Sequence, residues 1–93
     1  MIVTFDPAKR ERTLAERGLD FADVPLVFDG DVLTRRDDRF DYGEERFISA
    51  GYLRGRMVVL VWTPRGDAIH VISVRHAHAK EERRWHDRFA RSG

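Results

Sequence analysis

Two runs of apolar, β-favouring residues separated by a short polar turn dominate the second half of this sequence. The runs span residues 57–63 (MVVLVWT) and 68–74 (AIHVISV), and the Pro-Arg-Gly of residues 64–66 suits a type I turn closed by a left-handed glycine. A third strand-like run, residues 47–53, precedes them across a tight turn at residues 54–55. The pattern predicts an antiparallel meander whose middle strand is buried on both faces.

The last of these strands is predicted to alternate with the usual period of two. One of its faces then carries Ile69, Val71, Ser73 and Arg75, and the other carries His70, Ile72, Val74 and His76. This alternation puts His70 and Arg75 on opposite faces of the sheet.

Helical signals precede the strands. Asp6 reads as an N-cap before a proline at the first helical position, and Gly18 reads as the residue that ends the helix, so residues 7–17 are predicted to be helical. Asp20 starts a second predicted helix that continues to residue 28. Pro25 removes one backbone donor from it and would kink it unless the helix begins late.

The remaining segments complete a predicted α+β fold. Residues 32–35 suit an edge strand, the strongly charged residues 36–45 suit a loop, and residues 79–90 suit a final helix with Trp85 and Phe89 one turn apart. The expected architecture is two N-terminal helices, an antiparallel β-sheet meander and a C-terminal helix.

Composition narrows the class of protein. A chain of 93 residues is expected to form a single domain over residues 1–93. Its apolar runs fall well short of the roughly 20 residues that span a bilayer, and its first residues lack the basic region of a signal peptide, so we expect a cytoplasmic protein without membrane association. The absence of cysteine excludes disulfides, thiolate zinc sites and a cysteine nucleophile.

Charge is distributed unevenly although the net charge is only +1. Residues 21–51 hold four arginines against eight acidic residues, whereas residues 52–93 hold nine basic residues against four acidic ones. Of the 17 basic residues 15 are arginine, the side chain best shaped for bidentate phosphate contact. The basic C-terminal half favours a polyanionic partner.

Five segments in a fixed order carry a resemblance to a known family. They are FDPAK at residues 5–9, RGLDF at 17–21 followed by VFD at 27–29, GEERFI at 43–48 with Gly51, TPRGD at 63–67, and VISVRHA at 71–77 with Glu81, Arg83 and Trp85. Over essentially the whole chain these segments resemble the BrnT toxins of bacterial type II toxin–antitoxin systems.

The resemblance implies a compact fold like that of the RelE-type toxins and an activity that cleaves RNA and arrests translation. It also implies a partner, a BrnA-like ribbon-helix-helix antitoxin that blocks the toxin. The complex would contact operator DNA only through this antitoxin. Because such an antitoxin is two-fold symmetric, the expected assembly is a heterotetramer of two toxins and two antitoxins.

The sequence departs from the family pattern in two places. Thr13 and Glu16-Arg17 stand where the family usually has Asn and then Lys-His, so a role assigned to that histidine does not transfer. His70 stands where the family tends to have arginine, which replaces a permanent cation with a titratable one.

RNA cleavage without a metal ion requires a base, a stabiliser of the charge on phosphorus, and an acid for the departing 5′-oxygen. Arg75, at the end of the last strand, is the first candidate for a phosphate clamp, and Arg46 is the second; each is alternatively only the partner of an acidic residue. The candidates for proton transfer are His76, His78 and Glu45, and one of the two histidines is alternatively a helix cap.

Other basic residues are candidates for RNA binding rather than chemistry. They are Lys9, Lys80, Arg83, Arg84 and His70, of which His70 is alternatively a core or interface histidine and Lys9 is alternatively solvated. A metal site at His76 and His78 has weak support because no cysteine and few acidic residues are nearby. We expect no metal and no cofactor.

A second class of function remains open, namely a non-catalytic module that binds RNA or protein. The two N-terminal helices are too weakly apolar to cover both faces of the sheet. We therefore expect the antitoxin to lie across an exposed side of the sheet near Trp62, His70 and Ile72, with its acidic residues at residues 75–84.

Overall fold

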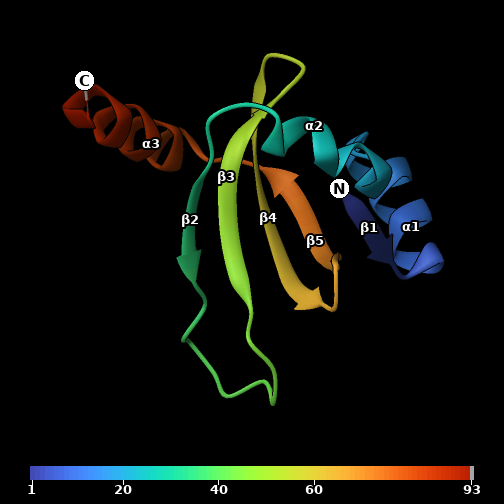
Figure 1. Cartoon of the computed structure of the whole chain (residues 1–93). Helices are drawn as coiled ribbons and strands as arrows, with labels where there is room; N and C mark the ends of the chain where they lie inside the picture. Colours follow the sequence, from blue (N-terminus) through green and yellow to red (C-terminus); the bar gives the residue numbers. More distant parts are fainter. Residues whose placement is uncertain (93) are drawn as a thin grey trace.

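The computed structural model describes residues 1–92, with side chains to residue 90, and is organised around one five-stranded sheet. In chain order the elements are β1 (Ile2–Phe5), α1 (Pro7–Arg17), the 3₁₀ turn η1 (Phe21–Asp23), α2 (Val24–Phe28), β2 (Leu33–Arg36), β3 (Phe47–Leu53), β4 (Arg56–Arg65), β5 (Ala68–His76) and α3 (Ala79–Ser92). The strands lie in the order β1-β5-β4-β3-β2 (Figure 1). The predicted α+β class is confirmed.

The helix boundaries follow the capping signals. Asp6 accepts a hydrogen bond from the backbone N–H of Ala8, and Gly18 closes α1 with a φ of 69°, as the sequence predicts. The second predicted helix divides in two, because Asp20 caps the short η1 turn and α2 begins only beside Pro25. A proline in the first turn costs no helical hydrogen bond, since that N–H would be unpaired anyway.

The sheet is mixed rather than a pure antiparallel meander, which corrects the expected order of elements. β1 precedes α1 and pairs in parallel with the first half of β5, from Ile2 opposite Ala68 to Phe5 opposite Val71. All other neighbouring strands are antiparallel. The short run of residues 2–5 shows too few alternations to reveal a strand in the sequence.

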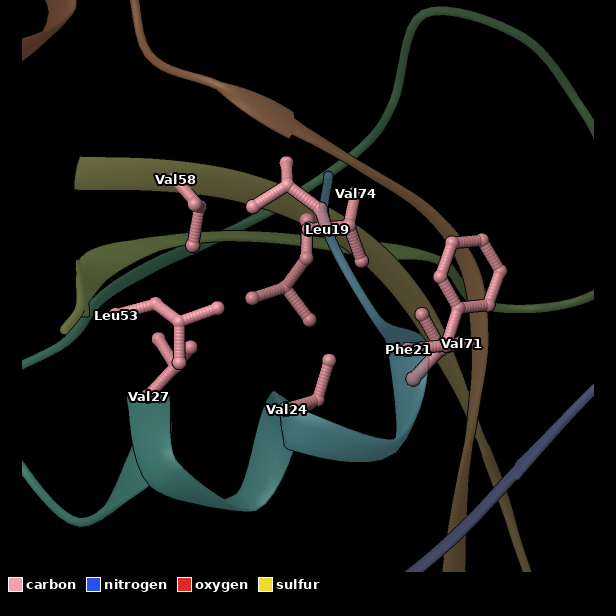
Figure 2. Packing of buried hydrophobic residues seen from close by; sticks show 9 residues of the cluster. Leu19, Phe21, Val24, Val27, Leu53, Val58, Val71 and Val74 are labelled. Atoms are coloured by element: carbon pink, nitrogen blue, oxygen red, sulfur yellow. The ribbon is translucent and has the colours of Figure 1, made fainter. Parts of the chain in front are cut away.

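One face of the sheet is packed against η1, α2 and the segment that leads into them, and this interface is the core. Its buried members are Leu19, Phe21, Val24, Val27, Leu53, Val58, Leu60, Val71 and Val74 (Figure 2). α2 approaches β3 so closely that a Cβ on Gly51 would lie 3.0 Å from a methyl carbon of Val27. Glycine at this position therefore allows the helix to contact the sheet.

A β-bulge changes the predicted alternation of β5. The pairing with β4 shifts between Val61, which faces Ser73, and Trp62, which faces Val71, so that Ile72 is an extra residue. Val71 and Val74 consequently both point into the core, which a strict period of two excludes. The prediction that His70 and Arg75 lie on opposite faces is wrong, because the bulge brings them to the same face.

Trp62 also lies elsewhere than expected. Its ring is stacked on Phe47 and meets Phe28 of α2 edge-on, with centroids 4.9 and 6.0 Å away, and its Nε1 donates to Ser49. Trp62 thus belongs to the helix-covered face. It does not mark an exposed surface for a partner.

The opposite side of the sheet, which we call the open face, is crossed only at one end within residues 1–92. There Trp85 of α3 donates its indole N–H to the carbonyl of Ala50, and Tyr52 donates to Glu82. The rest of α3 extends away from the sheet, on the side opposite to α1 (Figure 1).

Candidate functional site

The open face collects most of the cations that the strands carry. Arg46, just before β3, lies on this face as well. Strand alternation and pairing place on it the side chains of Thr4, Leu33, Arg35, Ile48, Ala50, Val59, Val61, Thr63, Arg65, His70, Ser73 and Arg75. Arg84 of α3 lines a small apolar hollow on this face together with Arg35 and Val59. Positive groups thus surround an apolar floor.

Arg75 is held at the α3 end of the open face by an acidic residue. Its guanidinium donates two hydrogen bonds of 2.8 Å to the carboxylate of Glu81. The same carboxylate accepts the backbone N–H of His78, the residue that precedes α3, as the glutamate of a capping box does. The bonds from Arg75 lower the pKa of Glu81 to about 2, and the bond to Glu81 raises the pKa of Arg75.

Arg46 lies at the other end of the open face. Its guanidinium is stacked on the ring of Tyr42, 4.0 Å from the centroid, and its Nε is buried without a hydrogen-bond partner among the described residues. The carboxylate of Glu44 lies between two arginines, 3.7 Å from Nε of Arg46 and 3.9 Å from Nη2 of Arg65. These contacts are ion pairs longer than hydrogen bonds.

His70 lies beside this second group of charges. Its Nδ1 is hydrogen bonded to the hydroxyl of Thr4 at 2.8 Å. Burial lowers the pKa of His70, the positive charge of Arg65 lowers it further, and the nearby Glu44 opposes both effects. The balance of these effects favours the neutral form of the imidazole.

The two ends of the open face are well separated. On β4, Val59 pairs with Arg75 and Thr63 pairs with His70. Four residues of strand correspond to about 13 Å. An extended RNA strand could contact both ends, but the two groups do not converge on one phosphate in this arrangement.

The structure places the other candidates for proton transfer away from the open face. His76 lies over the helix-covered face, where its Nε2 donates to the carbonyl of Arg17 and its Nδ1 is buried without a partner in the described residues. His78 is exposed at the start of α3, and Glu45 is exposed in the loop before β3, 3.9 Å from Arg36. Their catalytic roles stay predictions.

Some of the candidates for RNA binding lie at the open face and others lie away from it. His70 and Arg84 lie at the open face, whereas Lys80 and Arg83 are exposed on α3. Lys9 donates its ammonium group to the backbone carbonyl of Ile72 at the edge of β5.

Sequence reasoning missed Arg35, Glu44, Arg65 and Thr4. The sequence predicts a turn at Arg65, but β4 continues through this residue. The position of Arg65 two residues after Thr63 is the signal that indicates a shared face. Thr4 and Glu44 give no local signal. They reach the site through the parallel pairing of β1 and through the loop before β3.

A comparison with models of known protein families tests the resemblance that the five sequence segments carry. Residues 5–81 match the family described as the ribonuclease toxin BrnT of type II toxin–antitoxin systems. The chain belongs to the BrnT family. The resemblance of the five segments is thereby confirmed, and the activity of the family is that of a ribonuclease toxin that acts with an antitoxin.

One further comparison and one property of the helices complete the description of this BrnT chain. No curated protein matches it significantly. In the part of the chain that the structure describes, no helix is both long and apolar enough to cross a membrane.

Proposed function

We propose that this BrnT toxin is a metal-independent endoribonuclease that acts in the cytoplasm, binds single-stranded RNA along its open face and arrests translation by cleaving it. The observation that carries the proposal is the gathering of Arg35, Arg46, Arg65 and Arg75 on the one sheet face that α1 and α2 leave free. Guanidinium groups stabilise the charge that builds up on a phosphate under attack, so the chemistry does not require a metal ion.

Arg75 contacts a backbone phosphate near α3. Two of its N–H groups are engaged by Glu81, but a guanidinium has five donors, and its side chain is 38% exposed. A third N–H donates to the carbonyl of His76, so Glu81 and this carbonyl orient the guanidinium while its two remaining donors are available. Arg84, on the next turn of α3, extends the same positive surface toward the hollow.

The direct test is cleavage of a labelled RNA by purified Arg75→Ala and Arg46→Ala variants. We expect each to cleave at least about tenfold more slowly, which corresponds to about 1.4 kcal/mol of transition-state stabilisation. Arg12→Ala on the exposed side of α1 is the control and should keep the wild-type rate. Wild-type rates in both open-face variants would remove the assignment.

The same experiment separates cleavage from mere binding. A wild-type protein that binds RNA without cutting it, and whose induction does not stop growth, would be the non-catalytic module. Loss of cleavage in Arg75→Ala at saturating RNA, with unchanged folding, would support the enzyme.

The antitoxin is proposed to be a BrnA-like ribbon-helix-helix protein that covers the open face and presents acidic residues to its arginines. It would connect two toxins in a heterotetramer and would alone contact operator DNA. Support comes from the hollow lined by Leu33, Ile48, Ala50 and Val59, an apolar surface that α3 borders only through Glu81 and Arg84.

Mixing the two purified proteins should give a complex that buries more than about 1,000 Å² in total and does not cleave RNA. Its mass by light scattering should correspond to two copies of each chain. A complex that cleaves at the full rate would contradict occlusion of the open face, and a 1:1 complex would contradict the heterotetramer.

A further inference from the structure

The end of the open face around Arg46 holds a set of groups that the α3 end lacks. Two guanidinium groups, Arg46 and Arg65, lie on either side of the Glu44 carboxylate, and His70 is next to them. We call these four residues, with the Thr4 that bonds His70, the Arg46–His70 cluster. It combines two phosphate-binding groups with one imidazole.

The guanidinium groups of the cluster are incompletely satisfied. Glu44 approaches them to 3.7 and 3.9 Å, whereas charge-assisted hydrogen bonds between such groups are about 2.7–2.9 Å long. The buried Nε of Arg46 has no hydrogen bond at all within the described residues. Nε itself is not accessible, so an anion between the two arginines would meet the exposed parts of their side chains, which are 27% accessible for Arg46 and 55% for Arg65.

The imidazole of the cluster is oriented and has one free nitrogen. The Thr4 hydroxyl engages Nδ1, and Nε2 has no protein partner in the described part of the chain. The charged groups that act on the ring are Arg65 of β4 and Lys9 of α1, which favour the neutral form, and Glu44 and Asp6, which favour the protonated form. When Nδ1–H donates to Thr4, the lone pair is on Nε2.

We propose that RNA is cut at the Arg46–His70 cluster, with Arg46 and Arg65 holding the scissile phosphate and His70 Nε2 removing the proton of the adjacent 2′-hydroxyl. The inference rests on the proposed function and assigns its chemical step to one end of the open face.

The chemical step is an internal transesterification. The 2′-oxygen forms a bond to phosphorus, the bond from phosphorus to the 5′-oxygen breaks, and that oxygen takes a proton from water. The products are a 2′,3′-cyclic phosphate and a 5′-hydroxyl end, and the imidazolium returns its proton to solvent. Thr4 and Glu44 act as positioning residues, because Thr4 orients the imidazole ring through its hydrogen bond to Nδ1 and Glu44 lies between the two guanidinium groups.

Two substitutions of His70 test the proton acceptor. His70→Asn keeps a hydrogen-bonding group near Thr4 but has no Nε2, and His70→Arg keeps a cation for the phosphate but no base at neutral pH. We expect both to retain RNA affinity within about threefold and to lose at least about 100-fold in cleavage rate, the usual contribution of a general base. His86→Asn on α3 is the matched control and should cleave like wild type.

The pH profile provides a readout that a structural role would not change. Wild-type cleavage should rise with pH through an apparent pKa below the usual 6.5 of histidine and then level off, because only neutral His70 accepts a proton. This acidic limb should be absent from the residual activity of His70→Asn. Thr4→Val should shift the limb and lower kcat while KM stays unchanged.

The outcomes distinguish the two proposals. If wild type cleaves RNA and Arg75→Ala impairs it, but His70→Asn and Arg65→Ala cleave at the wild-type rate, the cluster is not the cleavage site although the proposed function stands. If wild type itself does not cleave RNA, the proposed function is wrong. Products that end in a 3′-phosphate without a detectable cyclic intermediate at early times would overturn the stated step.

Discussion

At the scale of single residues, Glu81 performs two tasks with one carboxylate. It accepts the backbone N–H of His78, the residue before α3, and it fixes Arg75 by two hydrogen bonds. Its carboxylate therefore connects the last strand to the last helix. A substitution here affects both the stability of α3 and the orientation of a candidate phosphate-binding group.

We predict that Glu81→Ala lowers the free energy of unfolding by about 1–2 kcal/mol at pH 7, the cost of a lost helix cap together with a partly exposed ion pair. The folded pKa of Glu81 is about 2, below its usual 4.5, so the stabilisation is complete above about pH 4.5 and disappears as the pH falls toward 2. Urea unfolding of wild type and variant at several pH values measures this difference. Asp87→Asn, an exposed change on α3, is the control, and a difference that does not vary with pH would contradict the prediction.

At the scale of elements, α1 completes the edge of β5 that β1 leaves open. β1 pairs only with the residues up to Val71, so the following carbonyl groups lack a strand partner on that side. Lys9 donates to the carbonyl of Ile72, and Arg17 donates to that of Val74 at 2.8 Å. Two cations of one helix thus replace a missing strand, which protects an edge that could pair with another chain.

We predict that Lys9→Met and Arg17→Met each lower the free energy of unfolding by about 1–2 kcal/mol, the range for hydrogen bonds to charged groups that leave an acceptor unpaired. Methionine retains most of the apolar stem of both side chains. Arg12→Met on the same helix should be neutral, and thermal or urea unfolding compares the three. If Lys9→Met weakened the free energy of RNA binding by more than it lowered the free energy of unfolding, Lys9 would contact RNA as the sequence predicts.

At the scale of the whole molecule, the two faces of the sheet differ in charge. The helix-covered face holds the core, whereas the open face carries arginines from β2, β4 and β5 together with one from α3. The overall charge of +1 hides this asymmetry. Binding to RNA should therefore depend on local phosphate contacts rather than on the net charge.

We predict that the affinity for a single-stranded RNA falls with salt with a log–log slope of about −2 to −3, as expected for three or four phosphate contacts at about 0.7 each. Arg84→Ala should reduce the slope by about 0.7, and Arg12→Ala on α1 should leave it unchanged. Fluorescence anisotropy at several salt concentrations measures both. A slope near zero, or an equal effect of the two substitutions, would show that RNA does not bind across the open face.

The sequence by itself determined the elements whose signals are local. The cap at Asp6 and the stop at Gly18 define α1, and the apolar runs of residues 47–53 and 57–63 define two strands, because neighbouring residues suffice to set backbone conformation there. The order of five segments also identified the BrnT family.

Only the tertiary structure decided which side chains share the open face. The bulge at Ile72 reverses the predicted relation of His70 to Arg75, and the parallel pairing of β1 brings Thr4 to His70 across 66 positions of the chain. Register and pairing depend on contacts between distant segments, and a one-residue shift moves a side chain to the other face. For that reason the sequence identified Arg46, His70 and Arg75 as candidates, but their arrangement at two ends of one surface follows from the fold.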